Sequence, residues 1–149
     1  MAVIVEFNPE TYAELFQDVL KDFPSLLDGL CRDFARYIES DRLWLPPYFG
    51  RDVPYVVPQE AYRAGLMHIH IAIPPTVFPA NRPQRDRTCP NGAPQQDAAL
   101  VYVQGLFEET RYSLLALLHP DAHGKARQRE MMTYLARVAG RFRDKPLPA

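Results

Sequence analysis

The segment from Met67 to Ile73, with the sequence MHIHIAI, alternates between two kinds of side chain. Alternate side chains of a β-strand point to opposite faces, so the Met and Ile side chains share one face. His68 and His70 share the other face. The pattern predicts a strand that needs an apolar layer on one side and presents two titratable imidazoles on the other. We therefore expect the chemistry of this chain to lie on the histidine face.

Two apolar runs further along the chain, residues 99–104 and 112–118, are predicted to be neighbouring strands of the same sheet. Residues 105–111 between them begin with glycine and suit a hairpin connection. A fourth, short strand is predicted for residues 2–7. Together these strands predict a small antiparallel sheet.

Two helices are predicted between the first strand and the histidine strand. Asn8 followed by Pro9 is a typical helix start, and the apolar stripe that follows it continues to the residue before Pro24. Ser25 and Asp28 are predicted to cap a second helix that has its own apolar stripe. Two amphipathic helices in succession indicate a helical hairpin packed on a sheet.

A last helix is predicted to begin between Asp121 and Lys125, after the strand broken by the pair His119-Pro120. Its predicted buried face carries apolar side chains at helical spacing: Met131, Leu135, Val138 and Phe142.

Two long segments show no regular period. Residues 41–65 are interpreted as a loop, and residues 74–97 contain six prolines and are interpreted as a mobile loop. The predicted fold is thus α+β, in the order β-α-α-β-β-β-α. The antiparallel sheet is expected to pack against two N-terminal helices and a C-terminal helix, within a single domain spanning residues 1–149.

Composition narrows the setting in which the protein works. The 149 residues carry a formal net charge of −1, which does not indicate a protein that grips nucleic acid by charge alone. The two cysteines, Cys31 and Cys89, are too few for a disulfide framework and favour a reducing compartment. Neither a signal peptide nor a membrane-spanning run is indicated. We expect a soluble, cytoplasmic protein without membrane contact.

Several short motifs, in the same order and spacing, resemble the YafO family of bacterial toxins. They are Phe49-Gly-Arg-Asp52, His68-Ile-His-Ile-Ala72, Leu100-Val-Tyr-Val-Gln-Gly105, and a tail with Pro120, His123, Ala126-Arg127, Met132, Ala139 and Phe142-Arg143. The resemblance covers residues 49 to 143 well and the first 45 residues only by the order of elements. Residues 89–95 look like an insertion relative to the family.

The resemblance implies a RelE-like fold and the toxin half of a type II toxin–antitoxin module. Proteins of this kind are described as ribosome-dependent mRNA interferases, which are endoribonucleases that cut messages during translation. The implied partners are a cognate antitoxin protein, the ribosome and mRNA. No cofactor is expected.

RNA cleavage without a metal needs a base for the 2′-hydroxyl, an acid for the leaving oxygen and cations for the phosphate charge. Histidine suits the proton transfers, and the planar arginine side chain suits the phosphate oxygens. The catalytic candidates are His68, His70, His123, Arg51 and Arg127. Arg127 follows His123 by four residues, so that a helix would place both on one side.

Five further residues are candidates for substrate binding: Asp52, Arg87, Tyr102, Gln104 and Arg143. Asp52 could orient Arg51, and Tyr102 with Gln104 could stack on a base or hydrogen-bond to it. For each candidate a structural role is the alternative: a salt-bridged turn, a packed sheet edge, or a solvated helix end.

Two other functions stay open from the residues alone. The protein could bind the ribosome and block translation without cutting RNA. It could also be a metal-dependent enzyme that uses His68 and His70, although no further ligand has suitable spacing. We expect no metal.

Overall fold

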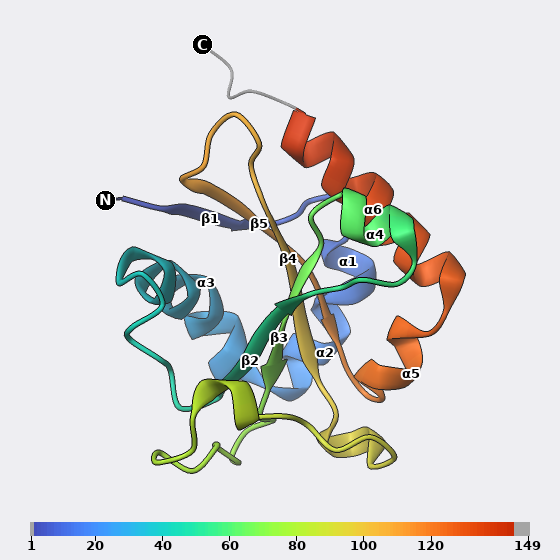
Figure 1. Ribbon diagram of the computed structural model, residues 1–149. Helices are drawn as coiled ribbons and strands as arrows, with labels where there is room; N and C mark the ends of the chain where they lie inside the picture. The colour runs from blue at the N-terminus through green and yellow to red at the C-terminus, as the bar shows by residue number, and fades with distance from the viewer. Residues whose placement is uncertain (1, 145–149) are drawn as a thin grey trace.

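The computed structural model describes residues 2–144, and within them the chain forms one five-stranded sheet with helices on both faces (Figure 1). The strands are β1 (Ile4–Phe7), β2 (Phe49–Pro54), β3 (Met67–Ile71), β4 (Ala99–Gln104) and β5 (Arg111–Leu118). Their order across the sheet is β1-β5-β4-β3-β2. All neighbouring strands are antiparallel except β1 and β5, which are parallel.

Six α-helices connect or follow the strands within the described residues. They are α1 (Tyr12–Leu15), α2 (Gln17–Asp22), α3 (Pro24–Glu39), α4 (Gln59–Arg63), α5 (Ala122–Ala126) and α6 (Arg129–Asp144), with single 3₁₀ turns at Gln84–Asp86 and Pro94–Gln96. In Figure 1, α3 lies on one side of the sheet, whereas α4, α5 and α6 lie on the other.

The face under α3 holds the larger apolar core. The apolar residues of α3 recur at intervals of three and four, so that Leu30, Phe34 and Tyr37 all point to the sheet and are fully buried. They pack with Ile69 and Ile71, which confirms the prediction that the apolar side of the β3 strand is covered.

The opposite face is covered by α6 over only part of its area. Met132, Leu135 and Val138 of α6 are buried against the β4 and β5 strands. His68 and His70 lie on this same face, because β3 pairs them with Val101 and Ala99. The two histidines thus share a face with the second core, beyond the area that α6 covers.

The α+β class is confirmed. The predicted order of elements lacks β2 and α4, and the predicted sheet lacks the one parallel pair of strands. Residues 41–65 were interpreted as a loop, yet they contain β2 and α4. β2 lacks the usual alternation because it contains an irregularity between Phe49 and Asp52 and ends in Pro54, as an edge strand can. The sheet is not wholly antiparallel, since β1 runs parallel to β5. Alternation reveals the two faces of a strand, not its direction.

The helix boundaries also differ from prediction. The first helix breaks at Phe16, and Asn8 closes a turn ahead of it by accepting a hydrogen bond from the Glu10 N–H at 2.9 Å. Pro24 begins α3, which has no side-chain cap, so the expected Ser25 and Asp28 cap is absent at this end. The last helix is two helices, α5 and α6. The predicted face of α6 is buried at Leu135 and Val138 and partly buried at Met131 and Phe142.

The proline-rich segment 74–97 has no strand or long helix, as predicted, but it is tied to the sheet at several points. The Gln84 side chain donates to the Gly50 carbonyl at 3.1 Å, and the Arg51 N–H donates to the Arg87 carbonyl at 2.9 Å. The Cys89 Sγ lies 3.2 Å from the Ile71 carbonyl oxygen. This segment therefore forms one end of the site described next.

Candidate active site

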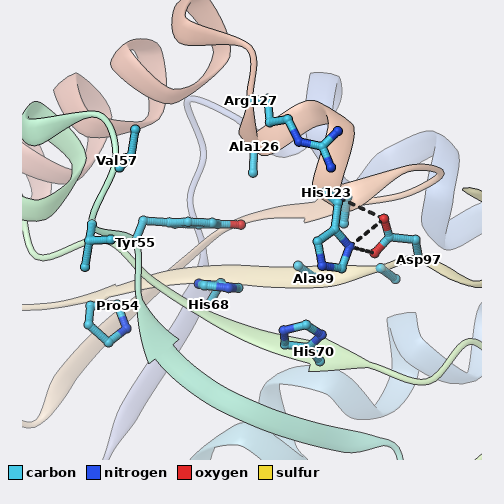
Figure 2. Close-up of a pocket in the computed structure, with 13 residues that line it drawn as sticks. Pro54, Tyr55, Val57, His68, His70, Asp97, Ala99, His123, Ala126 and Arg127 are labelled. Atoms are coloured by element: carbon cyan, nitrogen blue, oxygen red, sulfur yellow. Dashed lines mark hydrogen bonds and ion pairs between the residues drawn. The ribbon is translucent and has the colours of Figure 1, made fainter. Parts of the chain in front are cut away.

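A pocket of about 310 Å³ lies on the histidine face, between β3, the segment that links β2 to α4, and helix α5 (Figure 2). Its titratable side chains are Tyr55, His68, His70, Asp97, His123 and Arg127. Apolar side chains, including Val57, Ala99 and Ala126, complete the lining. The sequence expectation that the chemistry would gather on this face is thus matched by a concave site that contains all three predicted histidines.

His123 and Asp97 form a bonded pair at one wall of the pocket. The His123 Nδ1 lies 2.9 Å from both carboxylate oxygens of Asp97, and the His123 backbone N–H donates to Asp97 Oδ2 at 2.8 Å. The Asp97 residue is only 1% exposed. A carboxylate can only accept here, so Nδ1 carries a proton, and in the neutral form of the ring Nε2 has the free lone pair. Figure 2 shows the ring edge opposite Asp97 turned toward the pocket.

The start of α5 positions His123. Asp121 is the N-cap, with a left-handed backbone (φ 57°), and its side chain accepts a hydrogen bond from the Gly124 N–H at 3.2 Å. The Ala122 N–H donates to the Asp97 main-chain carbonyl at 3.2 Å. Backbone hydrogen bonds therefore fix the start of α5 against Asp97, which restricts the orientation of the His123 ring.

His70 is held in the other tautomer. The backbone N–H of Cys89 donates to His70 Nδ1 at 2.9 Å, so the proton of the neutral ring is on Nε2. Burial and the neighbouring His123 lower the pKa of His70 to about 4, and the positive charge of Arg51 acts in the same direction. His70 is thus a neutral hydrogen-bond donor at neutral pH. Its ring centroid lies 5.8 Å from that of His123.

His68 lies flat against Tyr55. The two rings are 3.8 Å apart and only 7° from parallel. Burial, followed by the charge of His70, lowers the pKa of His68 to about 4. Its Nδ1 is buried and has no hydrogen-bond partner among the described residues. One face of this imidazole is covered, and it stays uncharged at neutral pH.

Two of the predicted arginines lie close to the histidines. Arg127 lines the pocket, and its Nη2 donates to the Asn91 side chain at 3.0 Å on the exposed rim. Arg51 is exposed on β2, and its charge lowers the pKa of both His68 and His70. These two guanidinium groups supply positive charge beside the neutral rings of His68 and His70.

Asp52 and Tyr102 were predicted to bind substrate, but the structure places them on the opposite face of the sheet. Asp52 accepts hydrogen bonds from the Tyr102 hydroxyl at 2.6 Å, the Tyr37 hydroxyl at 2.7 Å and the Arg42 Nε at 3.1 Å. Arg51 and Asp52 therefore do not form a pair. Successive residues of a strand point to opposite faces, which separates the two side chains.

Three other predicted substrate contacts also lie outside the pocket. The Arg87 side chain is 5% exposed and donates to main-chain carbonyls, including that of Arg82 at 2.9 Å. Gln104 donates to the Glu109 carbonyl across the β4–β5 hairpin at 2.7 Å. Arg143 packs on Gly65, where an added Cβ would lie 2.6 Å from its Nη1.

Asp97 and Tyr55 line the pocket but were not among the sequence candidates. Asp97 ends the proline-rich segment, and no periodic pattern marks it. Once the structure pairs His70 with Ala99, the residues just before Ala99 must lie near His70. A correct guess of this strand register would have pointed to Asp97. Tyr55 follows the unrecognised strand β2, so its position could not be assigned before that strand was known.

The described part of the chain contains no group of three or more His, Cys, Asp or Glu side chains placed to hold a metal ion. Between residues 2 and 144, no helix is both long and apolar enough to cross a bilayer.

Fold and site together define a small α+β protein with a histidine-lined pocket on the part of a sheet face that α6 leaves open. The chain belongs to the YafO family: the family described as "Toxin YafO, type II toxin-antitoxin system" matches residues 35–144. The chain is also 35% identical over 123 residues to the mRNA interferase toxin YafO of Escherichia coli (strain K12), covering 78% of this chain and 85% of that protein. None of the solved structures gives a significant match. The family resemblance predicted from the motifs is confirmed.

Proposed function

We propose that this protein is the toxin of a type II toxin–antitoxin module and acts as an endoribonuclease that cleaves mRNA during translation. Membership of the YafO family and the name of the Escherichia coli relative support this activity. The observation that carries the proposal is the Asp97–His123 pair, in which Asp97 binds Nδ1 and leaves Nε2 available to an open pocket. A buried carboxylate that orients a histidine is a recurring arrangement for general-base catalysis.

The proposed reaction is a transesterification within the RNA chain. His123 Nε2 takes the proton of a ribose 2′-hydroxyl, and the 2′-oxygen attacks the adjacent phosphorus. A bond forms between phosphorus and the 2′-oxygen, and the bond to the 5′-oxygen breaks. The leaving oxygen takes a proton from water at the open mouth of the pocket. The products are a 2′,3′-cyclic phosphate and a 5′-hydroxyl.

The remaining polar groups match the charge that develops in this step. His70 offers its Nε2–H as a neutral donor to a phosphate oxygen. Arg127, which lines the pocket, and Arg51, whose charge acts on His70, supply positive charge near the histidines. Preorganised donors and cations of this kind stabilise a phosphorane more strongly than the ground-state phosphodiester.

We further propose that the ribosome holds the substrate. With 17 basic and 18 acidic residues the chain has little general attraction for RNA phosphates, because non-specific affinity comes from neutralising them. An enzyme that cuts a message already threaded through the ribosome does not need such attraction. On this proposal the protein acts in the cytoplasm and a cognate antitoxin restrains it. Its fold is a RelE-like one extended by the edge strand β2.

The direct test adds purified protein to a translation extract and maps the 5′ ends of the message by primer extension, with and without ribosomes. We expect cuts only when ribosomes are engaged, and no cuts with His123→Gln. Stalled translation on an intact message would replace this proposal with a ribosome-binding blocker. Cuts in naked RNA would remove the ribosome requirement.

A separate measurement addresses a metal-dependent reaction at His68 and His70. Elemental analysis of the purified, active protein should find no stoichiometric transition metal. A bound metal whose loss on His70→Ala parallels the loss of cleavage would overturn the metal-free mechanism.

A further inference from the structure

Tyr55 has an unusual hydroxyl. The residue is 8% exposed, and its main chain is fixed by a hydrogen bond from its N–H to the Leu66 carbonyl at 3.0 Å. Its ring is clamped against His68. Figure 2 shows the hydroxyl directed into the pocket, toward the side on which His123 lies. Within residues 2–144 this hydroxyl makes no hydrogen bond.

Three of the other tyrosine hydroxyls of this chain have a protein acceptor. Tyr37 and Tyr102 both donate to Asp52, at 2.7 and 2.6 Å, and Tyr48 donates to Asp33 at 2.6 Å. Buried polar groups normally find such partners, because leaving one unpaired costs roughly 1–3 kcal/mol. The Tyr55 hydroxyl, which faces an open pocket and has no protein partner among the described residues, is available to donate to a bound ligand.

We propose that Tyr55 is a further catalytic residue, whose hydroxyl donates a hydrogen bond to a non-bridging oxygen of the scissile phosphate, and that His68 is a positioning residue that holds the Tyr55 ring by stacking. This inference rests on the proposed ribonuclease function and names a donor that the mechanism above does not use. Negative charge grows on the non-bridging oxygens as the 2′-oxygen attacks, so a fixed donor there binds the transition state more tightly than the substrate.

The chemistry of both rings agrees with these roles. Burial and the charge of Asp97 raise the pKa of the Tyr55 hydroxyl, which therefore keeps its proton and remains a donor. His68 is uncharged at neutral pH, and the Tyr55 ring covers one of its faces. A flat neutral ring in this place supports its neighbour and is poorly suited to move a proton.

The test measures the single-turnover rate of message cleavage in the ribosome-containing extract. Tyr55→Phe keeps the ring and the stack but removes the hydroxyl, and it should lower the rate about 30-fold without changing its pH profile. Tyr62→Phe is the matched control, because Tyr62 is 58% exposed on α4 and does not line the pocket. It should cleave at the wild-type rate.

The role of His68 is tested by two substitutions of different shape. His68→Phe keeps a flat ring under Tyr55 and should stay within about threefold of wild type. His68→Ala removes the support and should lose about as much rate as Tyr55→Phe. The double variant Tyr55→Phe/His68→Ala should be no slower than His68→Ala alone, because both changes remove the same interaction. Thermal unfolding confirms that each variant is folded.

The outcomes separate this inference from the function on which it rests. Wild-type cleavage by Tyr55→Phe, with His123→Gln inactive, would overturn the donor role and leave the proposed ribonuclease intact. An inactive but folded His68→Phe would overturn the positioning role and make His68 a proton-transfer group. Full cleavage by His123→Gln would instead remove His123 as the base, and an intact message with the wild-type protein would overturn the proposed function itself.

Discussion

Two aspartates with buried side chains lie on opposite faces of the same sheet and have different hydrogen-bond partners. Asp52, whose side chain is 5% exposed, receives hydrogen bonds from Tyr37, Tyr102 and Arg42 under the cover of α3. Asp97, whose side chain is 1% exposed, binds His123 through its backbone N–H and its ring. We call the first group the Asp52 cluster and the second the Asp97 pair.

The two groups differ in whether a partner of the aspartate keeps a hydrogen-bonding atom that faces a pocket. In the Asp52 cluster the donors all bind one carboxylate, and Arg42 also donates to the Tyr102 hydroxyl at 3.4 Å. In the Asp97 pair the aspartate occupies only one nitrogen of the imidazole and thereby frees the other for the pocket. A buried carboxylate has a structural role when all its partners are hydrogen-bonded within the same cluster. It can have a functional role when it orients a partner that faces a pocket.

The largest expected effect is the loss of activity in Asp97→Asn. One carboxylate oxygen receives the His123 backbone N–H, so an asparagine that keeps this bond presents its NH₂ group to the ring. The proton of the ring then moves to Nε2, and the base is lost. We expect cleavage about 10³-fold slower, equivalent to about 4 kcal/mol, with a nearly unchanged melting temperature. Primer extension over time measures the rate, and an undiminished rate would mean that Asp97 does not orient the base.

A large loss of stability, with little effect on catalysis, is expected for Asp52→Ala. Removing the carboxylate leaves two tyrosine hydroxyls and the Arg42 side chain without their shared acceptor. The free energy of unfolding should fall by about 3 kcal/mol in urea denaturation. The cleavage rate per folded molecule should stay within twofold of wild type. A selective loss of that rate would show that the Asp52 cluster also serves the site.

Gly50→Ala should disturb β2, the strand that carries Asp52. An added Cβ would overlap the Arg87 carbonyl oxygen and lie 2.9 Å from the Phe78 ring. We expect about 2 kcal/mol of destabilisation by urea denaturation, because the proline-rich segment must move away from β2. Gly140→Ala is the control, since a Cβ there meets nothing within 4 Å and α6 should gain slightly. Equal stability of the two variants would contradict the close packing.

A further expected effect is a pH dependence of stability that belongs to the pocket histidines. His68 and His70 have pKa values of about 4 in the folded protein, against the ordinary 6.5. Between these values the unfolded chain binds protons that the folded chain excludes. The stability they contribute is complete above pH 6.5 and is lost as the pH falls toward 4.

The slope is at most about 1.4 kcal/mol per pH unit for each histidine, and solvent screening reduces it. Urea denaturation from pH 4.5 to 7 measures it. The double variant His68→Gln/His70→Gln should show a flatter dependence over the same range. Parallel curves for the two proteins would mean that the histidines titrate normally in the folded state.

Local patterns were enough for much of the fold and for part of the site. Alternation in β3 separated the histidine face from the apolar face, and helical spacing located α3 and α6. The candidates His70, His123 and Arg127 lie together in one pocket. The geometry of one strand or helix sets the relative directions of residues a few positions apart, such as His68 and His70 or His123 and Arg127. Only the fold brings these two pairs together.

Other features depend on contacts between distant segments, and no local pattern encodes them. Asp97 and His123 are 26 residues apart and meet only because the segment before β4 passes beside α5. Tyr55 reaches His68 through strand β2, whose irregular register hid it from a periodicity search. The same packing placed Asp52 and Tyr102 under α3, away from the histidines. The sequence indicated which face could carry chemistry, whereas the assembled sheet and its covering segments selected the carboxylate that orients the base.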